Sequence, residues 1–412
     1  MKNNICIFED NGFNELLPLT YLRTTFQLKC GMLSLLDKIK IHFGRTKYYL
    51  IPRIILVDLL KEENENVLNK SLPNEDLLFI NGRILINETI KKLILELKVN
   101  EVLKHNNNII AAFISKDNIS NIKFDKNGLP DFSLLKLNKQ SCDNFLITYP
   151  WELVNNNSQE IINDFEKINK SNKSTKKFSL NSFVNKKDIF ISSTAKVSSF
   201  VFFDASDGPI LIDDNALILP HTYLKGPIYI GKNTLVKANS SIYHGTSIGE
   251  FCKVGGEIEE SIIHSYSNKQ HDGFLGHSYL AQWINLGAGT NNSDLKNNYS
   301  KISVLLNGKN VFTNSQFVGA IIGDHTKTSI NTKINTGSIF GVACNIFTND
   351  FPPKYLPSFS WCGKDKVTKY VFNKFLETAK VVMKRRNINI SEAQIKLLKI
   401  VYEESTLEKT DV

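Results

Sequence analysis

The 412-residue sequence lacks several features that would place it in a common class. No apolar run reaches the roughly 18 residues of a transmembrane helix, so we expect no membrane association. No run of five basic residues and no aromatic-basic RNA-binding motif occurs, so we expect no nucleic-acid partner despite the net charge of +9. No GxGxxG motif follows a strand-like run, which argues against a Rossmann-type cofactor site. The positive charge would suit small acidic ligands such as phosphates.

Cysteine pairs at metal or redox spacing are also lacking. The sequence has no CxxC motif and no histidine at zinc spacing from a cysteine. We therefore expect reduced, mostly buried thiols and a cytoplasmic protein. The six cysteines are Cys6, Cys30, Cys142, Cys252, Cys344 and Cys362.

The first part of the chain alternates short apolar runs with helical spacing. Apolar runs lie at 5–8, 48–51 and 77–80, and residues 32–41 have helical periodicity. This alternation predicts an α/β domain with a mostly parallel sheet over residues 1–175, whose ligands would lie at the carboxyl ends of the strands. The polar, basic residues 176–189 are interpreted as a linker.

A period of six residues begins after about residue 190. Such a period matches neither a helix nor a simple alternating strand, but it is typical of a β-solenoid in which each unit forms one flat face. We therefore predict a solenoid over residues 190–350 and a helical tail over 351–412, and we expect 256–279, where the phase slips, to leave the coil as a loop. The aliphatic positions that keep the period are Ile212, Ile218, Leu224, Ile230, Val236, Ile242, Ile248 and Val254.

One stretch of the solenoid is unusually rich in histidine, amide and glycine residues. Residues 268–290 read NKQHDGFLGHSYLAQWINLGAGT, and GGE precedes them at 255–257. This stretch resembles the acetyltransferase segment of the bifunctional GlmU family. A divergent GlmU-like branch of sugar nucleotidyltransferases is more similar still, because it also carries an LLPLT element, here at 16–20, and an FSW element, here at 359–361.

The resemblance implies a fold, substrates and an assembly. It implies a Rossmann-like nucleotidyltransferase domain, a left-handed parallel β-helix of hexapeptide repeats and a short helical tail. The implied reactions are acetyl transfer from acetyl-CoA to an amino-sugar 1-phosphate and nucleotidyl transfer from UTP or another nucleoside triphosphate. The partners would then be a sugar phosphate, a nucleoside triphosphate and an acyl-CoA, and the assembly a homotrimer.

The resemblance also assigns candidate residues for acetyl transfer. His271 matches the base that removes a proton from the sugar amine, a task suited to an imidazole. Asn285 matches an amide that positions substrate, and Ala288 and Gly289 lie where backbone N–H groups approach the thioester. Phe274 replaces a tyrosine that contacts the sugar phosphate.

Other candidates replace groups that the family places elsewhere. The acidic run 257–260 stands near the usual phosphate lysine, so Lys269 or Lys253 would have to bind that phosphate. In the tail, Lys384, Arg385 and Arg386 could meet the phosphates of acetyl-CoA or could form an ordinary solvated helix end. His277 is expected to support the site indirectly, and His244 and His264 to be rim residues.

The nucleotide site differs more from the family pattern. The glycine-rich GTRM loop is missing, which leaves Arg23 and Lys29 as candidates for phosphate contact or as plain surface charge. Asn81, before Gly82, stands where relatives have the aspartate that holds Mg²⁺, so any Mg²⁺ site would need help from Asp10 or Glu9.

Three functions therefore stay open from the sequence. The chain could catalyse both reactions, or it could retain only one, with the other domain idle. It could also be a non-catalytic scaffold that binds a sugar nucleotide.

Overall fold

The computed structural model describes residues 4–143, 145–168, 173–174 and 178–405. These residues form two compact units. Of the described residues, the first contains those within 4–16, 22–28 and 33–149, and the second contains those within 17–21, 29–32 and 150–405. Helix α5 (Pro150–Lys167), which follows the predicted α/β pattern, thus packs within the second unit, against the solenoid strands.

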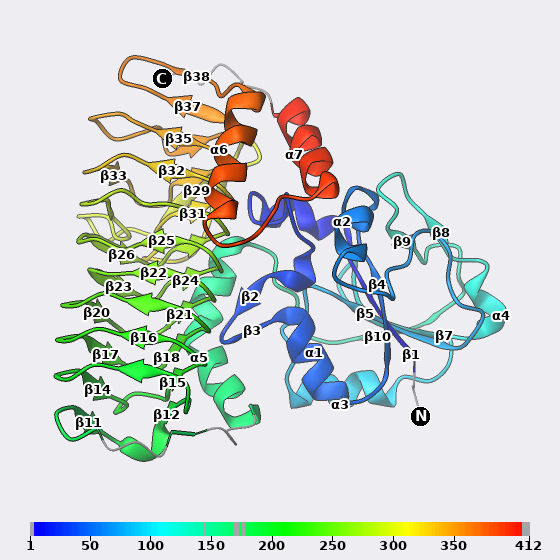
Figure 1. The fold of residues 1–412 in the computed structure, drawn as a ribbon. Helices are drawn as coiled ribbons and strands as arrows, with labels where there is room; N and C mark the ends of the chain where they lie inside the picture. Colours follow the sequence, from blue (N-terminus) through cyan, green and yellow to red (C-terminus); the bar gives the residue numbers. More distant parts are fainter. Residues whose placement is uncertain (1–3, 144, 169–172, 175–177, 406–412) are drawn as a thin grey trace. The chain divides into compact units, whose positions relative to one another are not determined.

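The first unit is built on a six-stranded mixed sheet (Figure 1). Its strand order is β10-β6-β7-β5-β1-β4, with β1 parallel to both β4 and β5, and β7 antiparallel to β5 and β6. The strands are β1 (Asn4–Phe8), β4 (Lys47–Ile51), β5 (Leu77–Asn81), β6 (Glu101–His105), β7 (Asn108–Ile114) and β10 (Asn138–Ser141). The predicted α/β class is therefore confirmed, with parallel pairs towards both edges of the sheet (β5–β1–β4 and β10–β6) and antiparallel pairing of the central strand β7.

Short helices and small strands complete this unit. Ser34 caps α1 by accepting the backbone N–H of Asp37, and Asn87 caps α3 through Ile90. The remaining elements are η1 (Asn11–Leu16), η2 (Thr25–Gln27), β3 (Leu33–Ser34), α1 (Leu35–Phe43), η3 (Ile54–Leu56), α2 (Val57–Lys61), α3 (Glu88–Glu96), α4 (Lys116–Ile119), β8 (Lys123–Phe124) and β9 (Pro130–Asp131).

The second unit is a parallel β-solenoid, and successive coils stack their strands into three faces (Figure 1). The first face contains β11 (Ser182–Val184), β14 (Phe202–Asp204), β17 (Tyr223–Lys225), β20 (Ser241–Ile242), β23 (Glu257–Glu259) and β26 (Phe274–Gly276). The second contains β12 (Ile189–Ile191), β15 (Ile210–Ile212), β18 (Ile228–Ile230), β21 (Thr246–Ile248), β24 (Ile262–Ile263), β27 (Tyr279–Leu280), β31 (Ile321–Ile322), β34 (Ile339–Phe340) and β36 (Tyr355–Leu356).

The third face is formed by two sets of strands that isolated bridges at Asn285 connect. Its strands are β13 (Lys196–Val197), β16 (Leu217–Ile218), β19 (Leu235–Val236), β22 (Lys253–Val254), β25 (Asn268–Lys269), β32 (Lys327–Thr328), β35 (Asn345–Ile346), β37 (Ser360–Cys362) and β38 (Val367–Lys369). Smaller elements of this unit are β2 (Lys29–Cys30), η4 (Lys186–Asp188), β28 (Asn291–Asn292) and β33 (Lys333–Ile334).

The six-residue period accounts for this solenoid. All eight periodic aliphatic residues are fully buried, one on each successive face, so each stacks on the residue one coil away. The predicted solenoid is therefore confirmed. Of the predicted linker, residues 176 and 177 lie outside the described residues, and β11 within it pairs with β14.

The phase slip at 256–279 does not produce a loop, so that prediction was wrong. β23 to β26 stay in the coil, because the slip only changes the number of residues at the corners. The segment that departs from the coil comes later, between β28 and β31, and carries the antiparallel hairpin of β29 (Ser303–Leu306) and β30 (Lys309–Phe312).

A stack of aromatic rings connects the solenoid to the tail. Phe251, Tyr266, Trp283 and His325 lie nearly parallel, with neighbouring centroids 5.2, 4.4 and 6.2 Å apart. The ring of His325 meets Phe375 of helix α6 (Phe372–Lys384) edge to face. This contact fixes α6 on the solenoid. Helix α7 (Glu392–Glu404) follows, with a capping box between Ser391 and Gln394.

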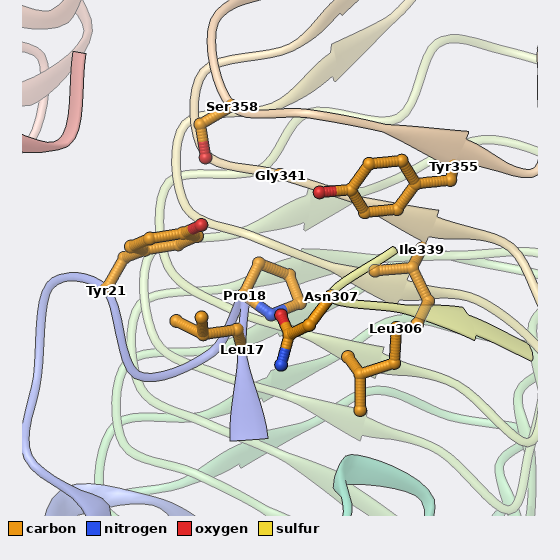
Figure 2. Close-up of a pocket in the computed structure, with 9 residues that line it drawn as sticks. All are labelled: Leu17, Pro18, Tyr21, Leu306, Asn307, Ile339, Gly341, Tyr355 and Ser358. Carbon is orange, nitrogen blue, oxygen red and sulfur yellow. The ribbon is translucent and has the colours of Figure 1, made fainter. Parts of the chain in front are cut away.

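The LLPLT element also packs on the solenoid. Leu17, Pro18 and Tyr21 line a small pocket with residues of the hairpin and of the coil turns, as Figure 2 shows. The hydroxyl groups of Tyr21, Tyr355 and Ser358 face this pocket. Burial raises the pKa of the Tyr21 phenol to about 12. Residues 17–21 are thus a structural element of the second unit.

Candidate functional site

The carboxyl edge of the first unit's sheet holds a closed polar network around Asn81. The Asn81 side-chain amide donates to Asp10 Oδ2 at 2.8 Å and to the Ile109 carbonyl at 2.9 Å, and its Oδ1 accepts the backbone N–H of Arg83 at 3.0 Å. Arg83 forms a two-point ion pair with Asp10, with both N–O distances 2.7 Å, and donates to the Ile147 carbonyl. Every polar atom of the Asn81 side chain is therefore engaged.

A second buried ion pair lies at the same edge. Glu9 and Arg53 are 0% and 3% exposed, and their side chains approach within 3.3 Å. Glu9 also accepts the backbone N–H groups of Thr25 and Arg53. Burial is the largest influence on Glu9 and raises the pKa of its carboxyl, whereas Arg53 lowers it. The guanidinium of Arg53 lies 4.0 Å from the ring centroid of Phe13.

These contacts do not fit the predicted Mg²⁺ site. A hard cation needs several oxygen ligands, but Oδ1 of Asn81 points to a backbone N–H and both oxygens of Asp10 bind Arg83. A β-carbon at Gly12 would lie 2.3 Å from the Arg83 guanidinium, so that cation fills the space beside the turn. Within the described ranges no group of three His, Cys, Asp or Glu side chains is arranged to hold a metal ion.

The other residues predicted to bind the nucleotide also make contacts within the protein. Arg23 is 5% exposed, and its carbonyl accepts Arg53. Gly82 is buried, with its N–H donated to the Phe8 carbonyl and with Phe26 closely packed on it. Lys29 belongs to the second unit, where its backbone N–H donates to the hydroxyl of Tyr279.

In the solenoid, Lys269 points inward and His271 points outward. Lys269 occupies the interior column beside Val254, is 2% exposed, and donates to the carbonyls of Gly255 and His271 at 2.9 and 2.8 Å. Burial lowers the pKa of its ammonium to about 8. Lys269 thus supports the turn that carries His271 and does not face a ligand. The imidazole of His271 is exposed, and no described residue hydrogen-bonds to it.

A ladder of polar side chains crosses the third face beside a basic helix end. Asn268, Asn285 and Lys327 are lateral neighbours on successive coils. Arg386, just past the end of α6, donates to Asn268 Oδ1 at 3.0 Å. Burial lowers the pKa of Lys253, and the nearby charges of Arg386, Arg385 and Lys237 lower it further. We call Lys237, Lys253, Arg385 and Arg386 the basic group.

This arrangement brings together candidates from two predicted sites. Lys253 was a candidate for binding the sugar phosphate, and the tail arginines were candidates for binding acetyl-CoA. The structure brings them together in one positive surface. Arg386 contacts Asn268, and Asn268 lies beside Asn285 on the next coil. Lys384 is the exposed last residue of α6. The repulsion that lowers the Lys253 pKa would be relieved by a bound anion.

Two backbone N–H groups were predicted to contact the thioester, and one of them is already used within the protein. The N–H of Gly289 donates to the Asp272 carbonyl at 3.1 Å, whereas no described residue accepts the N–H of Ala288. Gly289 is required there, because its φ is +68° and a β-carbon would lie 2.2 Å from Asn331 Oδ1. The backbone N–H of Phe274 donates to Asn291 Oδ1, and its ring is half-buried on the outer side of the first face.

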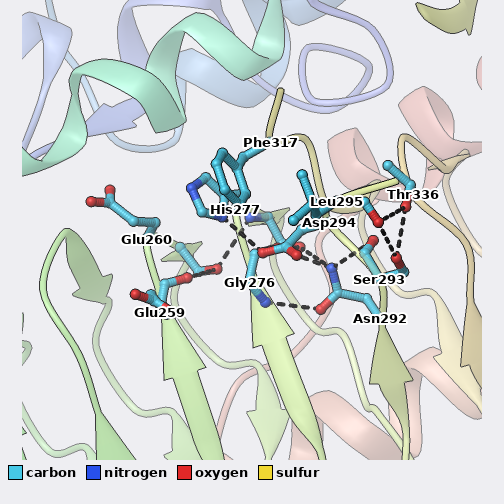
Figure 3. Close-up of polar contacts among 12 residues, drawn as sticks. Glu259, Glu260, Gly276, His277, Asn292, Ser293, Asp294, Leu295, Phe317 and Thr336 are labelled. Atoms are coloured by element: carbon cyan, nitrogen blue, oxygen red, sulfur yellow. Dashed lines mark hydrogen bonds and ion pairs between the residues drawn. The ribbon is translucent and has the colours of Figure 1, made fainter. Parts of the chain in front are cut away.

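A cluster of ionisable groups lies at the corner between the first and second faces, and Figure 3 shows most of it. We call His244, Glu259, Glu260, His277 and Asp294 the corner cluster. Nδ1 of His277 lies 2.8 Å from Asp294 Oδ2, and Nε2 of His244 lies 3.2 Å from Glu260 Oε1. His264, by contrast, is buried and accepts the N–H of Ser265, a structural role.

Parts of the chain are similar to known proteins. Residues 5–173 match the model of a family described as sugar nucleotidyl transferase. A bifunctional sugar-1-phosphate nucleotidylyltransferase/acetyltransferase of Sulfurisphaera tokodaii is 30% identical over 142 residues, which cover 34% of this chain and 35% of that protein. Bifunctional protein GlmU of Anaplasma marginale is 30% identical over 176 residues, covering 41% and 36%. The chain is similar to the GlmU-like enzymes.

The matches with these GlmU-like relatives span about a third of each relative's length. A solved UDP-N-acetylglucosamine acyltransferase from Bacteroides fragilis shares 12% identity and covers 54% of this chain and 91% of its own, with a TM-score of 0.24, too low to support an inference. In the part of the chain that the structure describes, none of the helices has the length and apolarity to cross a membrane.

Sequence reasoning missed most of the corner cluster. It treated Glu259 and Glu260 only as an obstacle to phosphate binding, and it did not pair His277 with Asp294. The residues are separated by up to 50 positions in the chain. The lateral pairing of Glu259 with Gly276 follows from the coil register, but the approach of Asp294 needs the three-dimensional fold.

Proposed function

We propose that the chain is a cytoplasmic GlmU-like enzyme of sugar-nucleotide synthesis. On the solenoid it transfers the acetyl group of acetyl-CoA to the amine of an amino-sugar 1-phosphate. In the first unit it transfers a nucleotidyl group from UTP or another nucleoside triphosphate to the resulting sugar phosphate. Support comes from the Sulfurisphaera tokodaii relative, whose name combines a sugar-1-phosphate nucleotidylyltransferase with an acetyltransferase, and from the family match of residues 5–173.

The basic group beside Asn268 and Asn285 is the observation that carries the acetyl-transfer half. Arginine binds phosphate through two parallel, charge-assisted hydrogen bonds, so Arg385 and Arg386 suit the phosphates of coenzyme A. The neighbouring amides would position the pantetheine or the acetyl group. The unengaged N–H of Ala288 would stabilise the oxyanion of the thioester carbonyl. The resemblance gives the proton acceptor as His271, which stays a prediction.

The network around Asn81 favours a second candidate function, in which only acetyl transfer is retained. Arg83 already neutralises Asp10, and the oxygen of Asn81 is turned to the backbone. No step through Mg²⁺ is therefore derived for the first unit. Arg53 and Arg83, the cations at the carboxyl edge of the sheet, are already paired with Glu9 and Asp10.

We propose a homotrimer, on the resemblance alone. Analytical ultracentrifugation of the purified chain tests it directly. A monomer of 46.7 kDa would contradict the trimer and leave each proposed activity to a single chain.

The deciding experiment measures two products in one sample. Purified protein is given acetyl-CoA and glucosamine 1-phosphate, and the free thiol is followed; UTP and Mg²⁺ are then added and pyrophosphate is followed. Thiol and pyrophosphate together support the bifunctional enzyme, and thiol alone supports the acetyltransferase. If neither product forms, both enzymatic proposals fail and a sugar-nucleotide-binding scaffold is favoured.

A further inference from the structure

A column of outward-facing side chains crosses the later coils of the third face. Isolated bridges and the pairing of β32, β35 and β37 place its members side by side on successive coils. Figure 1 shows these three strands stacked in that order. Because each coil repeats the position of the coil before it, the side chains project from the same side of the face. We call Asn268, Asn285, Lys327, Asn345 and Trp361 the third-face column.

Lys327 of this column is a half-buried cation without an acidic partner. Its Nζ donates to the carbonyl of His325 at 2.9 Å, and no carboxylate of the described residues forms an ion pair with it. Burial lowers the pKa of its ammonium to about 8. An ammonium has three N–H donors, so two of them are left for a bound group.

Asn345 is a buried amide without a hydrogen-bond partner. It is 5% exposed, and its side chain makes no hydrogen bond to any described residue. Ile346 beside it is fully buried inside the coil, so Asn345 faces outward, next to Lys327 on one side and Trp361 on the other. A buried amide that lacks partners is costly, and a ligand that hydrogen-bonds to it removes that cost. The unpaired amide therefore argues for a ligand at this position.

The column ends on an exposed aromatic surface. The rings of Phe347 and Trp361 are stacked, with centroids 5.4 Å apart and a tilt of 18°, and the two residues are 48% and 39% exposed. Phe347 lies two residues after Asn345, so it faces the same side of the strand. Trp361 also meets the ring of Tyr370 edge to face, at a centroid distance of 5.0 Å. Exposed aromatic rings bind nucleobases by stacking. We call Phe347 and Trp361 the aromatic platform.

The basic group lies on the same face at a set distance from Lys327. Lys253 pairs laterally with Asn268, so three coils separate it from Lys327, which is about 14 Å at about 4.8 Å per coil. Arg386 contacts Asn268, which lies two coils or about 10 Å from Lys327. No described carboxylate forms an ion pair with any of these cations. The face therefore offers two separate positive positions to one anionic ligand.

We propose that Lys327 and Asn345 bind the 3′-phosphate of coenzyme A and that the aromatic platform stacks on its adenine. The basic group then binds the pyrophosphate of the same molecule. Coenzyme A fits this arrangement, because one ribose carries the adenine, the 3′-phosphate and, at its 5′ carbon, the pyrophosphate. The inference rests on the proposed acetyl transfer, since it takes acetyl-CoA as the donor. It makes Lys327 and Asn345 residues that determine donor specificity.

A phosphate matches these groups better than a carboxylate does, because a phosphate monoester has three free oxygens and a carboxylate has two. The oxygens can accept the two free N–H donors of Lys327 and the amide N–H of Asn345 at the same time. Hydrogen bonds between an ammonium and a phosphate are charge-assisted and therefore strong. Dephospho-CoA, which lacks the 3′-phosphate, leaves the ammonium and the amide without this partner. The two residues therefore discriminate between the two donors.

The binding test uses two nucleotide probes and the full-length protein. Adenosine 3′,5′-bisphosphate contains the 3′-phosphate and the adenine, and adenosine 5′-monophosphate lacks the 3′-phosphate. Calorimetric titrations compare wild type with Lys327→Met, which removes the charge and keeps most of the length, and with Asn345→Leu, which removes the amide and keeps the shape. Lys196→Met is the matched control, because Lys196 is exposed and occupies the equivalent outward position on an early coil of the same face.

We expect wild type to bind the bisphosphate more tightly than the monophosphate. Lys327→Met should weaken binding of the bisphosphate about 10- to 100-fold, as expected for a charge-assisted hydrogen bond, and Asn345→Leu should weaken it about fivefold. Lys196→Met should leave both affinities unchanged. Equal affinities of wild type for the two probes, or an unchanged affinity of Lys327→Met for the bisphosphate, overturns the proposal. If Lys327→Met does not fold, Asn345→Leu decides in its place.

The position of the adenine has a readout of its own in tryptophan fluorescence. Trp361 is the exposed residue among the three tryptophans, because Trp151 and Trp283 are 3% and 6% exposed. Stacking of the adenine on Trp361 should quench the emission, and Trp361→Phe should abolish the quenching. Binding of the bisphosphate without quenching, or quenching that persists in Trp361→Phe, contradicts the placement of the adenine on the platform.

Kinetic measurements separate this proposal from acetyl transfer itself. In Lys327→Met the KM for acetyl-CoA should rise about 10- to 100-fold with kcat nearly unchanged, whereas the KM for acetyl-dephospho-CoA should equal that of wild type. If wild type releases no thiol but binds the bisphosphate, and Lys327→Met weakens that binding, the donor site stands and acetyl transfer fails. If thiol is released and Lys327→Met keeps the wild-type KM for acetyl-CoA, acetyl transfer stands and the donor site is overturned.

Discussion

The carboxyl edge of the first unit's sheet and the corner of the solenoid both gather charged side chains, but they use them differently. At the sheet edge each acidic group meets an arginine: Asp10 binds Arg83 through two contacts, and Glu9 binds Arg53 in full burial. At the solenoid corner, the ion-pair partners that the described residues offer the acidic groups are histidines, and the basic group lies apart from them on the third face.

This difference separates charge that stabilises a fold from charge that is available to a ligand. A buried ion pair satisfies both partners and leaves little for a third group. An excess of one sign, in contrast, remains costly until a counter-charge binds. The solenoid is therefore the better candidate for a ligand-binding or catalytic site, although the family match covers the first unit and α5.

The largest effect is expected from breaking the Asp10–Arg83 pair. Arg83→Ala leaves a carboxylate without its partner inside the sheet edge, which should cost about 3–5 kcal/mol in the free energy of unfolding. Urea denaturation followed by circular dichroism measures it. Lys92→Ala is the control, since Lys92 pairs with Glu96 on an exposed helix face and should cost less than about 0.5 kcal/mol. Equal costs would show that the sheet edge is not held by this pair.

The buried ammonium of Lys269 should produce a pH-dependent effect of up to about 3 kcal/mol. Its pKa is lowered to about 8 in the fold, against about 10.5 in the unfolded chain, so the folded state binds fewer protons between these values. The penalty of burying the charge is fully present below pH 8 and is relieved as pH rises towards 10.5. Wild type should thus gain stability relative to Lys269→Met over this range.

Wild type and Lys269→Met both contain the buried thiols of Cys252 and Cys344, so the contribution of these thiols to the free energy of unfolding cancels when the two proteins are compared at each pH. Their folded pKa values are raised to about 12, and they act in the opposite direction as pH rises. Lys309→Met, on the exposed hairpin, is the control and should show no such trend. A pH-independent difference between wild type and Lys269→Met would contradict the inward placement of the ammonium.

A smaller effect is expected from the basic group. Arg386→Ala removes a cation next to Asn268 and should raise the KM for acetyl-CoA about tenfold, as expected for one charge-assisted hydrogen bond to a phosphate. The wild-type KM should rise with salt more steeply than that of the variant. Lys399→Ala, on an exposed face of α7, serves as the comparison. If both variants keep the wild-type KM, the basic group is only a solvated helix end.

The smallest effect concerns the start of α7. Ser391→Ala removes the hydroxyl that accepts the N–H of Gln394 and should cost about 1 kcal/mol, confined to that helix. Hydrogen exchange of α7 amides detects such a local change. Thr378→Ala, at a half-buried position of α6, should leave exchange in α7 as it is in wild type.

The period-six pattern was enough to predict the solenoid, because it reports directly which residues stack inside the coil. Helix α7 and its capping box were also predictable, since both depend on residues close in sequence. The inward placement of Lys269 was not, because hydropathy assigns a lysine to the surface. Only the register with Val254 shows that it occupies the interior column.

The candidate sites were less predictable than the fold. The oxygen of Asn81 could have faced a ligand, and its orientation depends on Arg83, whose side chain could have pointed to solvent. Likewise, nothing in the local sequence pairs His277 with Asp294, seventeen residues later. Such contacts are set by side-chain packing across coils and strands, which residue spacing does not encode.

The most direct test of the contrast between the two edges is calorimetric titration of the wild-type protein, first with acetyl-CoA and then, separately, with UTP in the presence and absence of Mg²⁺. We expect acetyl-CoA to bind, and any binding of UTP to be independent of Mg²⁺. Failure of acetyl-CoA to bind, together with tight binding of UTP that requires Mg²⁺, would contradict the account.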